Sequence, residues 1–255
     1  MGRLKRAVIL LNGSPHYRRD AFAAGLKATG YETVFENNAD PKPGDVLVIW
    51  NRYKDAIARE FERAGASVLV AENAWVGPED KDKHYFALCR GHHNGAGTWH
   101  VGAEKRWPKL GIELKPWRKS GSYILVLPQR GMGERGVSMP PNWPENVVSR
   151  LRKVTNLQVR IRSHPGPRPH APIDFTDCWA AVVWASGAGI KAIIEGIPVF
   201  YEFSRWIGAW AARHGIEDID EPFLGDRMPM LERMAWAMWT ADEISSGEPF
   251  RWLLK

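Results

Sequence analysis

The feature that most restricts the fold is a series of short apolar runs that alternate with helical segments along the 255 residues. Apolar runs without polar alternation are typical of strands that are buried on both faces of a sheet. In the first half of the chain we expect strands at 7–11, 46–50 and 67–70, and helices at 20–28 and 55–64. Buried strands separated by helices predict a parallel sheet, and therefore a Rossmann-like α/β lobe.

The same alternation returns after Gly121. Strands are expected at 123–127, 157–161, 180–184 and 199–201, and helices at 144–153, from about 189, at 204–213 and at 229–240. The segment 72–120 between the two patterns has no clear periodicity, and long irregular segments in compact domains are more often functional than structural. The sequence therefore predicts two Rossmann-like lobes, 1–119 and 120–255, and the repeated pattern is compatible with two copies of one architecture.

Composition supports a folded protein without a membrane span. Hydrophobic residues make up 44% of the chain, which includes thirteen tryptophans, so there is enough apolar surface to offset the entropy of folding. The chain has no run of eighteen apolar residues, and the apolar stretch before Asn12 is too short for a signal peptide. Cys89 and Cys178 are expected to be free thiols. These features predict a cytoplasmic protein with no membrane partner.

The tryptophans of the last third are spaced by three and four residues, as in the set Trp206, Trp210, Trp236 and Trp239. Such spacing favours core packing on helices. A sugar-stacking role for one of them is the alternative.

Positive charge is concentrated in the first half of the sequence. Residues 1–120 contain twenty lysines and arginines against fourteen aspartates and glutamates, whereas residues 121–255 contain fifteen of each. A basic half joined to a neutral half suggests that one lobe meets a polyanion, and nucleic acid is the usual polyanion in a cytoplasm. A simple contribution to solubility is the alternative.

Two strand ends in the second half carry groups that suit a phosphate. Strand 157–161 runs into Arg162 and His164, and open α/β sheets bind ligands at the carboxyl ends of their strands. Strand 180–184 runs into Ser186 and Gly187, where the N–H groups that open the next helix favour a diphosphate. Further along that helix, Glu195 is placed to accept hydrogen bonds from ribose hydroxyls.

A plain structural interpretation competes with this one, because glycine pairs after strands are common, His164 is compatible with an ordinary loop, and Glu195 with a helix end. The motifs GxxxxGK[ST] and GxGxxG are both absent, which argues against an ATPase and an ordinary NAD enzyme.

The order of HPG at 164–166, a strand, and WASGAGIKAIIEGIPVF at 184–200 resembles the donor half of GT-B glycosyltransferases. It is especially similar to capsule-type Kdo transferases and to small phage-encoded glycosyltransferases that share the pattern SSxGxEALLxGxPV. The resemblance covers about residues 121–255 and implies a two-lobed fold with the active site in the interlobe cleft. It implies that His164, Ser186 and Gly187 hold the donor phosphates and that Glu195 faces the nucleotide. Here Lys191 stands where the pattern has its glutamate.

The remaining donor contacts are cations. Arg130, Arg162 and His164 are expected to stabilise a leaving diphosphate without a metal, and Lys191 is expected to lie beside the donor.

The catalytic base has two candidates in the first lobe. The segment 72–75, Glu-Asn-Ala-Trp, is similar to the EDGF segment that carries the catalytic acid of the capsule transferases, with Asn73 in place of the aspartate. The resemblance implies that Glu72 deprotonates an acceptor hydroxyl. A surface carboxylate is the alternative for Glu72, and His93 is a rival base.

The segment 89–100 and its neighbours suggest acceptor contacts. His92, His93 and Asn94 are predicted to face the cleft as hydrogen-bonding groups. A zinc site built from Cys89, His92, His93 and His100 is a weak alternative, because one cysteine without a second is a poor structural set, and no metal is predicted. Mixed cations and aromatic residues suit a nucleic-acid backbone and a displaced base, namely Lys105, Arg106, Trp107 and Arg118.

Together these features predict a glycosyltransferase that uses a nucleotide sugar, UDP-sugar or similar, and has no tightly bound cofactor. The favoured acceptor is a hydroxymethylated pyrimidine in DNA, modified by a phage-encoded enzyme in the host cytoplasm. One alternative is a transferase that acts on a polysaccharide or a lipid-linked sugar. The other is a noncatalytic module of the same fold that binds a nucleotide or DNA.

Overall fold

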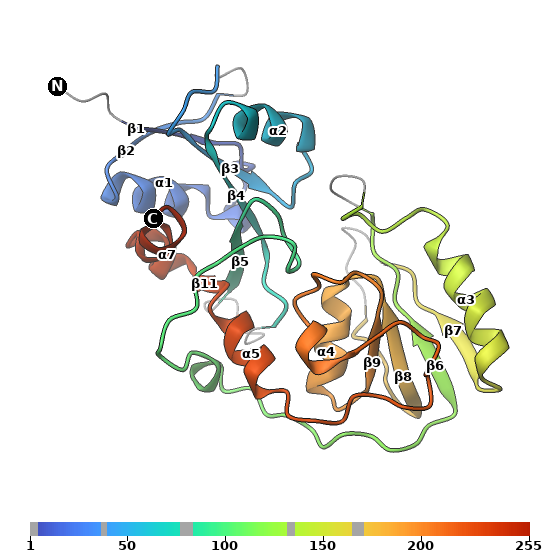
Figure 1. Ribbon diagram of the computed structural model, residues 1–255. Coiled ribbons are helices and arrows are strands. Elements are labelled where there is room, and N and C mark those ends of the chain that lie inside the picture. Colours follow the sequence, from blue (N-terminus) through green and yellow to red (C-terminus); the bar gives the residue numbers. More distant parts are fainter. Residues whose placement is uncertain (1–4, 37–39, 77–83, 132–135, 165–170) are drawn as a thin grey trace. The chain divides into compact units, whose positions relative to one another are not determined.

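The computed structural model describes residues 5–36, 40–76, 84–131, 136–164 and 171–255, and it contains two compact units (Figure 1). The first unit combines residues 1–106 with residues 233–255, and the second unit comprises residues 107–232. The predicted division at residue 119 differs from this arrangement in two ways. The chain leaves the first unit after Arg106, and its last segment returns to that unit.

The first unit is built on a six-stranded sheet with the order β11-β5-β4-β3-β1-β2. Its strands are β1 (Lys5–Ile9), β2 (Tyr31–Val34), β3 (Val46–Trp50), β4 (Ser67–Asn73), β5 (Tyr85–Arg90) and β11 (Met238–Thr240). Its helices are η1 (Pro15–Tyr17), α1 (Arg19–Ala28), α2 (Asp55–Arg63), α6 (Ala241–Ser245) and α7 (Glu248–Leu253). Strands β1 to β4 are parallel, whereas β5 pairs antiparallel with both β4 and β11.

Helices cover both faces of this sheet because successive side chains of a strand point to opposite faces. On one face Ile9, Val48 and Leu69 pack with residues of α1 and of the returning segment, including Phe22 and Phe250. The other face packs against α2 in a second apolar cluster formed by Val8, Leu47, Ile49, Ala58, Phe61, Val68 and Val70. The predicted Rossmann-like architecture of this part is confirmed.

Gly25 marks the tightest contact between α1 and the returning segment. A Cβ atom at this position would overlap the carbonyl oxygen of Ile244 and lie 2.7 Å from the ring of Phe250. We expect Gly25→Ala to lower the free energy of unfolding by about 3 kcal/mol, as overpacking of a core does. Ala24→Ser, at an exposed position of the same helix, is the matched control. Denaturant unfolding of both variants measures the difference, and equal stability would show that α1 does not pack this closely.

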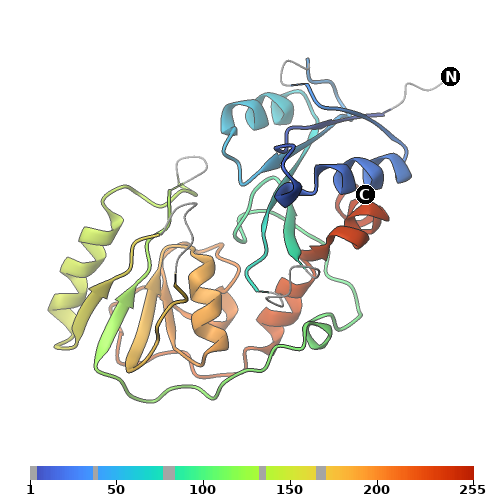
Figure 2. The same ribbon diagram turned by 180° about the vertical axis from the view of Figure 1, so that it is seen from behind.

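The second unit is built on a five-stranded parallel sheet with the order β10-β9-β8-β6-β7. Its strands are β6 (Tyr123–Val126), β7 (Gln158–Ile161), β8 (Cys178–Val183), β9 (Val199–Tyr201) and β10 (Arg213–His214). Its helices are η3 (Trp107–Leu110), α3 (Trp143–Val154), α4 (Gly187–Ile194) and η4 (Ala209–Ala211), and α5 (Met228–Ala235) spans the return to the first unit. Helices α3 and α4 lie on opposite faces of the sheet (Figures 1 and 2).

Two predicted helices are wrong. The stretch 204–213 contains only the short η4, because Trp206 turns into the core and the chain around Gly208 closes tightly over its ring. The stretch 229–240 is helical only as α5, after which β11 pairs with β5. The side chains of Trp206, Trp236 and Trp239 are buried as predicted, whereas that of Trp210 is 61% exposed.

Within the described parts of the chain, every helix is too short or too polar to cross a lipid bilayer.

Candidate functional site

The order of strands in the second sheet creates a point at which the connections diverge. The chain leaves β6 toward β7 on one side and leaves β8 toward β9 on the other side. In open α/β sheets, ligands bind outside the carboxyl ends of the strands at such a switch point. The loops after β6 and β8 meet there, because the backbone N–H of Ala185 donates a hydrogen bond to Oε1 of Gln129 over 2.9 Å.

Ser186 organises the loop after β8. It is the N-cap of α4, and its Oγ accepts a hydrogen bond of 3.2 Å from the N–H of Ala188. A hydroxyl that accepts one hydrogen bond can still donate its own hydrogen. Gly187 is the first residue of α4, so the positive end of the helix dipole lies at the switch point, where it favours an anion. Lys191 is exposed one turn further along the helix.

Gly189 serves packing at this helix. A Cβ atom here would lie 2.7 Å from the ring of Trp206, so the absence of a side chain lets α4 approach the core.

The predicted cations lie in the loops after β6 and β7. Arg130 is exposed after β6. Arg162 follows β7, where its backbone N–H donates to the carbonyl of Val126 over 3.0 Å and its Nη2 donates to the carbonyl of Ala171 over 2.8 Å. His164 is exposed two residues later, and Pro165 and Gly166 lie outside the described residues. Arg130, Arg162, Ser186 and Gly187 therefore all follow the carboxyl ends of β6, β7 and β8, at one edge of the sheet.

Glu195 is not among them. It is the C-cap residue of α4 and forms an ion pair with Lys115. Ser186 lies at the other end of this helix, nine residues before Glu195, which is about 13.5 Å along the axis at 1.5 Å per residue. The geometry therefore does not support the predicted ribose contact of Glu195.

Two polar residues of this edge were missed by the sequence analysis. Gln129 joins the two loops, as described above. Glu202 directly follows β9 and accepts a hydrogen bond of 2.6 Å from Nε1 of Trp143, together with an ion pair from Arg150. The signal that would have found both residues is a polar side chain within three positions of the end of a predicted parallel strand.

The first sheet has a switch point of the same kind, between β1 and β3. After β1, Oδ1 of Asn12 accepts a hydrogen bond of 2.8 Å from the N–H of Ser14. After β3, Asn51 and Arg52 both have positive φ angles, of 39° and 57°. Arg52 serves the fold, since its buried guanidinium pairs with Asp55 and Glu62 of α2 and donates to the carbonyl of Gly91.

Glu72 and Cys89 lie close to each other. Burial, together with the nearby carboxylate of Glu72, raises the pKa of the Cys89 thiol to about 12. The thiol is therefore protonated at neutral pH and is a poor metal ligand. The catalytic role of Glu72 stays a prediction.

His92 and His93 lie in the interior of the first unit. Their rings stack with centroids 4.6 Å apart. Burial lowers the pKa of His93 to about 3, and the charges of His92 and Arg52 act in the same direction. A ring with this pKa is a weak base at neutral pH, which argues against His93 as the catalytic base. Asn94 accepts a hydrogen bond of 3.1 Å from Nε1 of the buried Trp75. His92, His93 and Asn94 therefore make contacts inside the first unit that hold their own loop in place.

The buried His93 ring predicts a dependence of stability on pH. The pKa of His93 falls from its ordinary value of 6.5 to about 3 in the folded state, so between these values the unfolded chain binds the extra proton. The contribution of His93 is complete above pH 6.5 and is lost as the pH falls, by about 1.4 kcal/mol per pH unit. His93→Gln is expected to remove this part of the slope, whereas His100→Gln, at an exposed ring, is expected to keep it. Urea unfolding from pH 7 to pH 4 measures the slope, and identical slopes in all three proteins would contradict the buried neutral ring.

Three of the four residues predicted to contact DNA serve the fold. Arg106 is buried, where it pairs with Glu243, donates to the carbonyl of Met238 and stacks 4.1 Å from the ring of Trp239. Trp107 is buried, and its backbone N–H donates to the carboxylate of Glu232. Arg118 donates to the carbonyls of Phe175 and Cys178. These contacts correct the prediction for Arg106, Trp107 and Arg118, and Lys105 is the one of the four whose side chain is exposed.

The division of charge also changes when residues are grouped by structural unit. The first unit contains nineteen lysines and arginines against sixteen acidic residues, and the second contains sixteen against thirteen. Each unit therefore carries the same formal net charge of +3. The basic lobe predicted from residues 1–120 does not exist as a structural unit, and the charge argument for nucleic acid is lost.

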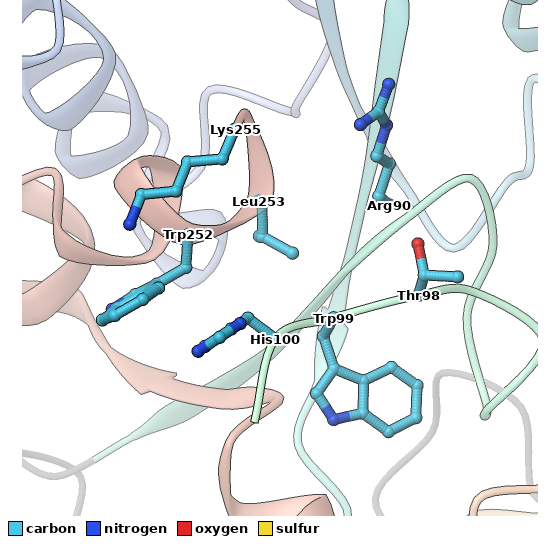
Figure 3. Close-up of a pocket in the computed structure, with 7 residues that line it drawn as sticks. All are labelled: Arg90, Thr98, Trp99, His100, Trp252, Leu253 and Lys255. Carbon is cyan, nitrogen blue, oxygen red and sulfur yellow. The ribbon is translucent and has the colours of Figure 1, made fainter. Parts of the chain in front are cut away.

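A small pocket of about 160 Å³ lies in the first unit (Figure 3). It is lined by Arg90, Thr98, Trp99, His100, Trp252, Leu253 and Lys255. The rings of His100 and Trp252 stack in parallel 4.3 Å apart, and Nζ of Lys255 lies 4.1 Å from the centre of the Trp252 ring. His100 thus packs against an aromatic ring.

The described residues contain no group of three or more His, Cys, Asp or Glu side chains that could hold a metal ion.

Comparison with known proteins gives a likeness in structure alone. No protein-family model matches the sequence, and no curated protein matches it. The solved structure of KpsC from Thermosulfurimonas dismutans, a beta Kdo 2,7 transferase, superposes with a TM-score of 0.58 at 11% identity. The match covers 96% of this chain and 98% of that chain.

A second solved structure, aspartate transcarbamoylase from Trypanosoma cruzi, has a TM-score of 0.27 and 17% identity, with 91% of this chain and 82% of that chain covered. That score is too low for an argument about the fold. The superposition on KpsC, together with one mainly parallel and one fully parallel sheet, shows that this chain has a two-lobed α/β fold of the GT-B type.

Proposed function

We propose that the protein is a glycosyltransferase that uses a nucleotide sugar and binds it on the second unit. The observation that carries the proposal is the arrangement at the switch point between β6 and β8. There the Gln129–Ala185 hydrogen bond joins the two loops, and the Ser186-capped end of α4 offers N–H groups to an anion. The donor of a glycosyltransferase presents such an anion in its phosphates, and helix N-termini at this place in a sheet suit them.

The surrounding side chains have distinct roles in this proposal. The hydroxyl of Ser186 donates to a phosphate oxygen, and Gly187 leaves the helix end open to it. Arg162, with Arg130 and His164 in the neighbouring loops, stabilises the negative charge that develops on the leaving phosphate. Lys191 adds a cation one turn into the helix.

Two acceptors are considered, and the first is a hydroxyl group of a saccharide. The equal charge of the two units and the internal contacts of Arg106, Trp107 and Arg118 remove the main support for DNA. KpsC is named as a transferase of the sugar Kdo, which makes a saccharide the first acceptor to test. A hydroxymethylated pyrimidine in DNA is the second candidate, favoured by the pattern at 184–200 that resembles small phage-encoded glycosyltransferases.

A survey of products tests the proposal. The protein is incubated with a panel of UDP- and CMP-sugars and either a synthetic oligosaccharide that ends in Kdo or duplex DNA that contains 5-hydroxymethylcytosine. Mass spectrometry of the intact oligosaccharide and of digested nucleosides is expected to show the mass gain of one sugar on the saccharide. A gain on the nucleoside would select the DNA candidate instead. Nucleotide binding without turnover would indicate a noncatalytic module, and absence of both would overturn the proposed function.

A further inference from the structure

We propose that four side chains at the carboxyl edge of the first sheet form the site that activates the acceptor, with Nδ1 of His84 as the atom that removes the proton from the acceptor hydroxyl. The four are His16, Trp50, Asn73 and His84, called here the edge cluster. This inference rests on the proposed function and assigns its catalytic base.

The topology of the sheet brings the edge cluster together. His16 lies in η1 after β1, Trp50 is the last residue of β3, and Asn73 is the last residue of β4. His84 directly precedes β5, whose start is tied to the end of β4 by the 3.1 Å hydrogen bond from the N–H of Ala74 to the carbonyl of Tyr85. All four residues therefore lie at the edge where the parallel strands end, and the cluster includes both sides of the switch point between β1 and β3.

Ring contacts hold the cluster in place. The ring of His16 lies 6.0 Å from Trp50 and 5.6 Å from His84 between centroids. The ring of His84 also packs edge-on against the fully buried Phe86, 4.7 Å away. The His84 ring is thus half-buried, with one side against the core and the other toward the exposed His16.

The hydrogen bond to Asn73 fixes which nitrogen of His84 is the base. Nε2 of His84 lies 3.2 Å from Oδ1 of Asn73. A carboxamide oxygen only accepts hydrogen bonds, so Nε2 must carry the hydrogen. In a neutral imidazole the other nitrogen then has the free lone pair, which assigns Nδ1 as the proton acceptor. Asn73 is therefore a positioning residue for His84.

The surroundings keep the ring of His84 neutral at pH 7. Burial lowers the pKa of His84, and the charges of His16 and Arg18 act in the same direction. A neutral imidazole is the form that a general base needs before it takes a proton.

The earlier candidate Glu72 belongs to the other face of the sheet. Side chains alternate along β4, so Leu69, Ala71 and Asn73 point to one face, and Leu69 and Ala71 pack in the cluster with α1. Val70 and Glu72 point to the opposite face, where Val70 packs with α2. An acceptor seated against His84 thus meets the face of Asn73 and Trp50.

The proposed step is a single displacement. Nδ1 of His84 takes the proton of the acceptor hydroxyl while the oxygen forms a bond to the anomeric carbon of the nucleotide sugar. The bond from that carbon to the phosphate oxygen breaks, and the phosphate leaves with the electron pair. The imidazolium later returns its proton to water.

Nuclear magnetic resonance tests the assignment without any activity. Ring ¹⁵N shifts of His84 are expected to show the hydrogen on Nε2 in the neutral form and a titration midpoint below that of a free histidine. Asn73→Asp is expected to raise this midpoint by about 1 to 3 pH units, because a carboxylate favours the imidazolium. A hydrogen on Nδ1, or a midpoint at or above that of free histidine in the unaltered protein, would overturn the assignment.

Kinetics test the role in transfer, with the donor and acceptor pair that the product survey identifies. His84→Gln is expected to lower kcat by about 10²- to 10⁴-fold, the contribution of a general base, and to leave UDP binding unchanged. Asn73→Asp is expected to move the acidic limb of the pH–rate profile to higher pH, which a merely structural change would not do. His214→Gln in β10 of the second unit is the control. If the unaltered protein transfers sugar and His84→Gln is equally fast, the base assignment alone fails; if the unaltered protein transfers none, the proposed function fails.

Discussion

Gly187→Asp is expected to abolish nucleoside diphosphate binding while the protein stays folded. Gly187 is the first residue of α4, where an acidic side chain interacts favourably with the helix dipole and stabilises the helix by about 0.3–1 kcal/mol. The same carboxylate would stand beside the bound phosphates. Two unit charges 4 Å apart repel by about 4 kcal/mol near a protein surface, which corresponds to a loss of affinity of about 10³-fold.

Thermal unfolding with and without UDP separates the two effects. The unaltered protein is expected to gain stability as UDP is added, because a ligand that binds only the folded state stabilises it. Gly187→Asp is expected to unfold at the same temperature as the unaltered protein or a higher one, and to show no shift with UDP. Gly187→Asn has nearly the same shape without the charge and is expected to keep most of the shift. A full UDP shift in the aspartate variant would place the phosphates elsewhere.

Arg106→Glu is expected to unfold the first unit rather than to weaken a binding surface. The guanidinium of Arg106 pairs with Glu243, caps the carbonyl of Met238 and stacks on Trp239, with 9% of the residue exposed. Charge reversal places two carboxylates together in this buried position. Breaking a buried ion pair costs about 3–5 kcal/mol, a large part of the stability of a typical domain.

The neighbouring Lys105 provides the matched control because its side chain is exposed. Lys105→Glu is expected to change the free energy of unfolding by less than about 0.5 kcal/mol. Urea unfolding followed by tryptophan fluorescence compares the two variants, and binding to duplex DNA at several salt concentrations is measured on the same samples. A stable Arg106→Glu protein that has lost salt-dependent DNA binding would restore the nucleic-acid interpretation and contradict the buried contacts.

Most of the parallel strands could be predicted because their signal is local, although β2 and the short β10 were missed. Strands β3 and β9 have the predicted bounds, since each is a short apolar run buried on both faces. The antiparallel strand β11 could not be predicted in this way. Its residues continue the helical spacing of the tryptophans, but the N–H of Leu88 bonds to the carbonyl of Ala237, a partner about 150 positions away in the sequence. The pattern of nearby residues carries no information about a pairing partner that is so distant in the sequence.

The residues of the candidate site also differ in whether their sequence signal is local. Ser186 and Gly187 lie at the strand end where sequence reasoning placed them, because a strand, a small loop and a helix follow one another directly. Arg106 was misinterpreted because its partners, Trp239 and Glu243, come more than 130 residues later. His84 escaped notice because its importance depends on contacts with His16 of η1 and Asn73 of β4, which lie elsewhere in the sequence.

The return of residues 233–255 to the first unit determines the order in which the two units can finish folding during synthesis. When a ribosome has made residues 1–106, β5 still lacks its neighbour β11, and the face of α1 that holds Phe22 and Leu26 still lacks α6 and α7. The second unit is continuous and has all its strands once residue 232 has emerged. The part of the chain that is synthesised first is therefore completed last, and a nascent chain stalled before residue 233 would expose an open apolar surface to chaperones and proteases.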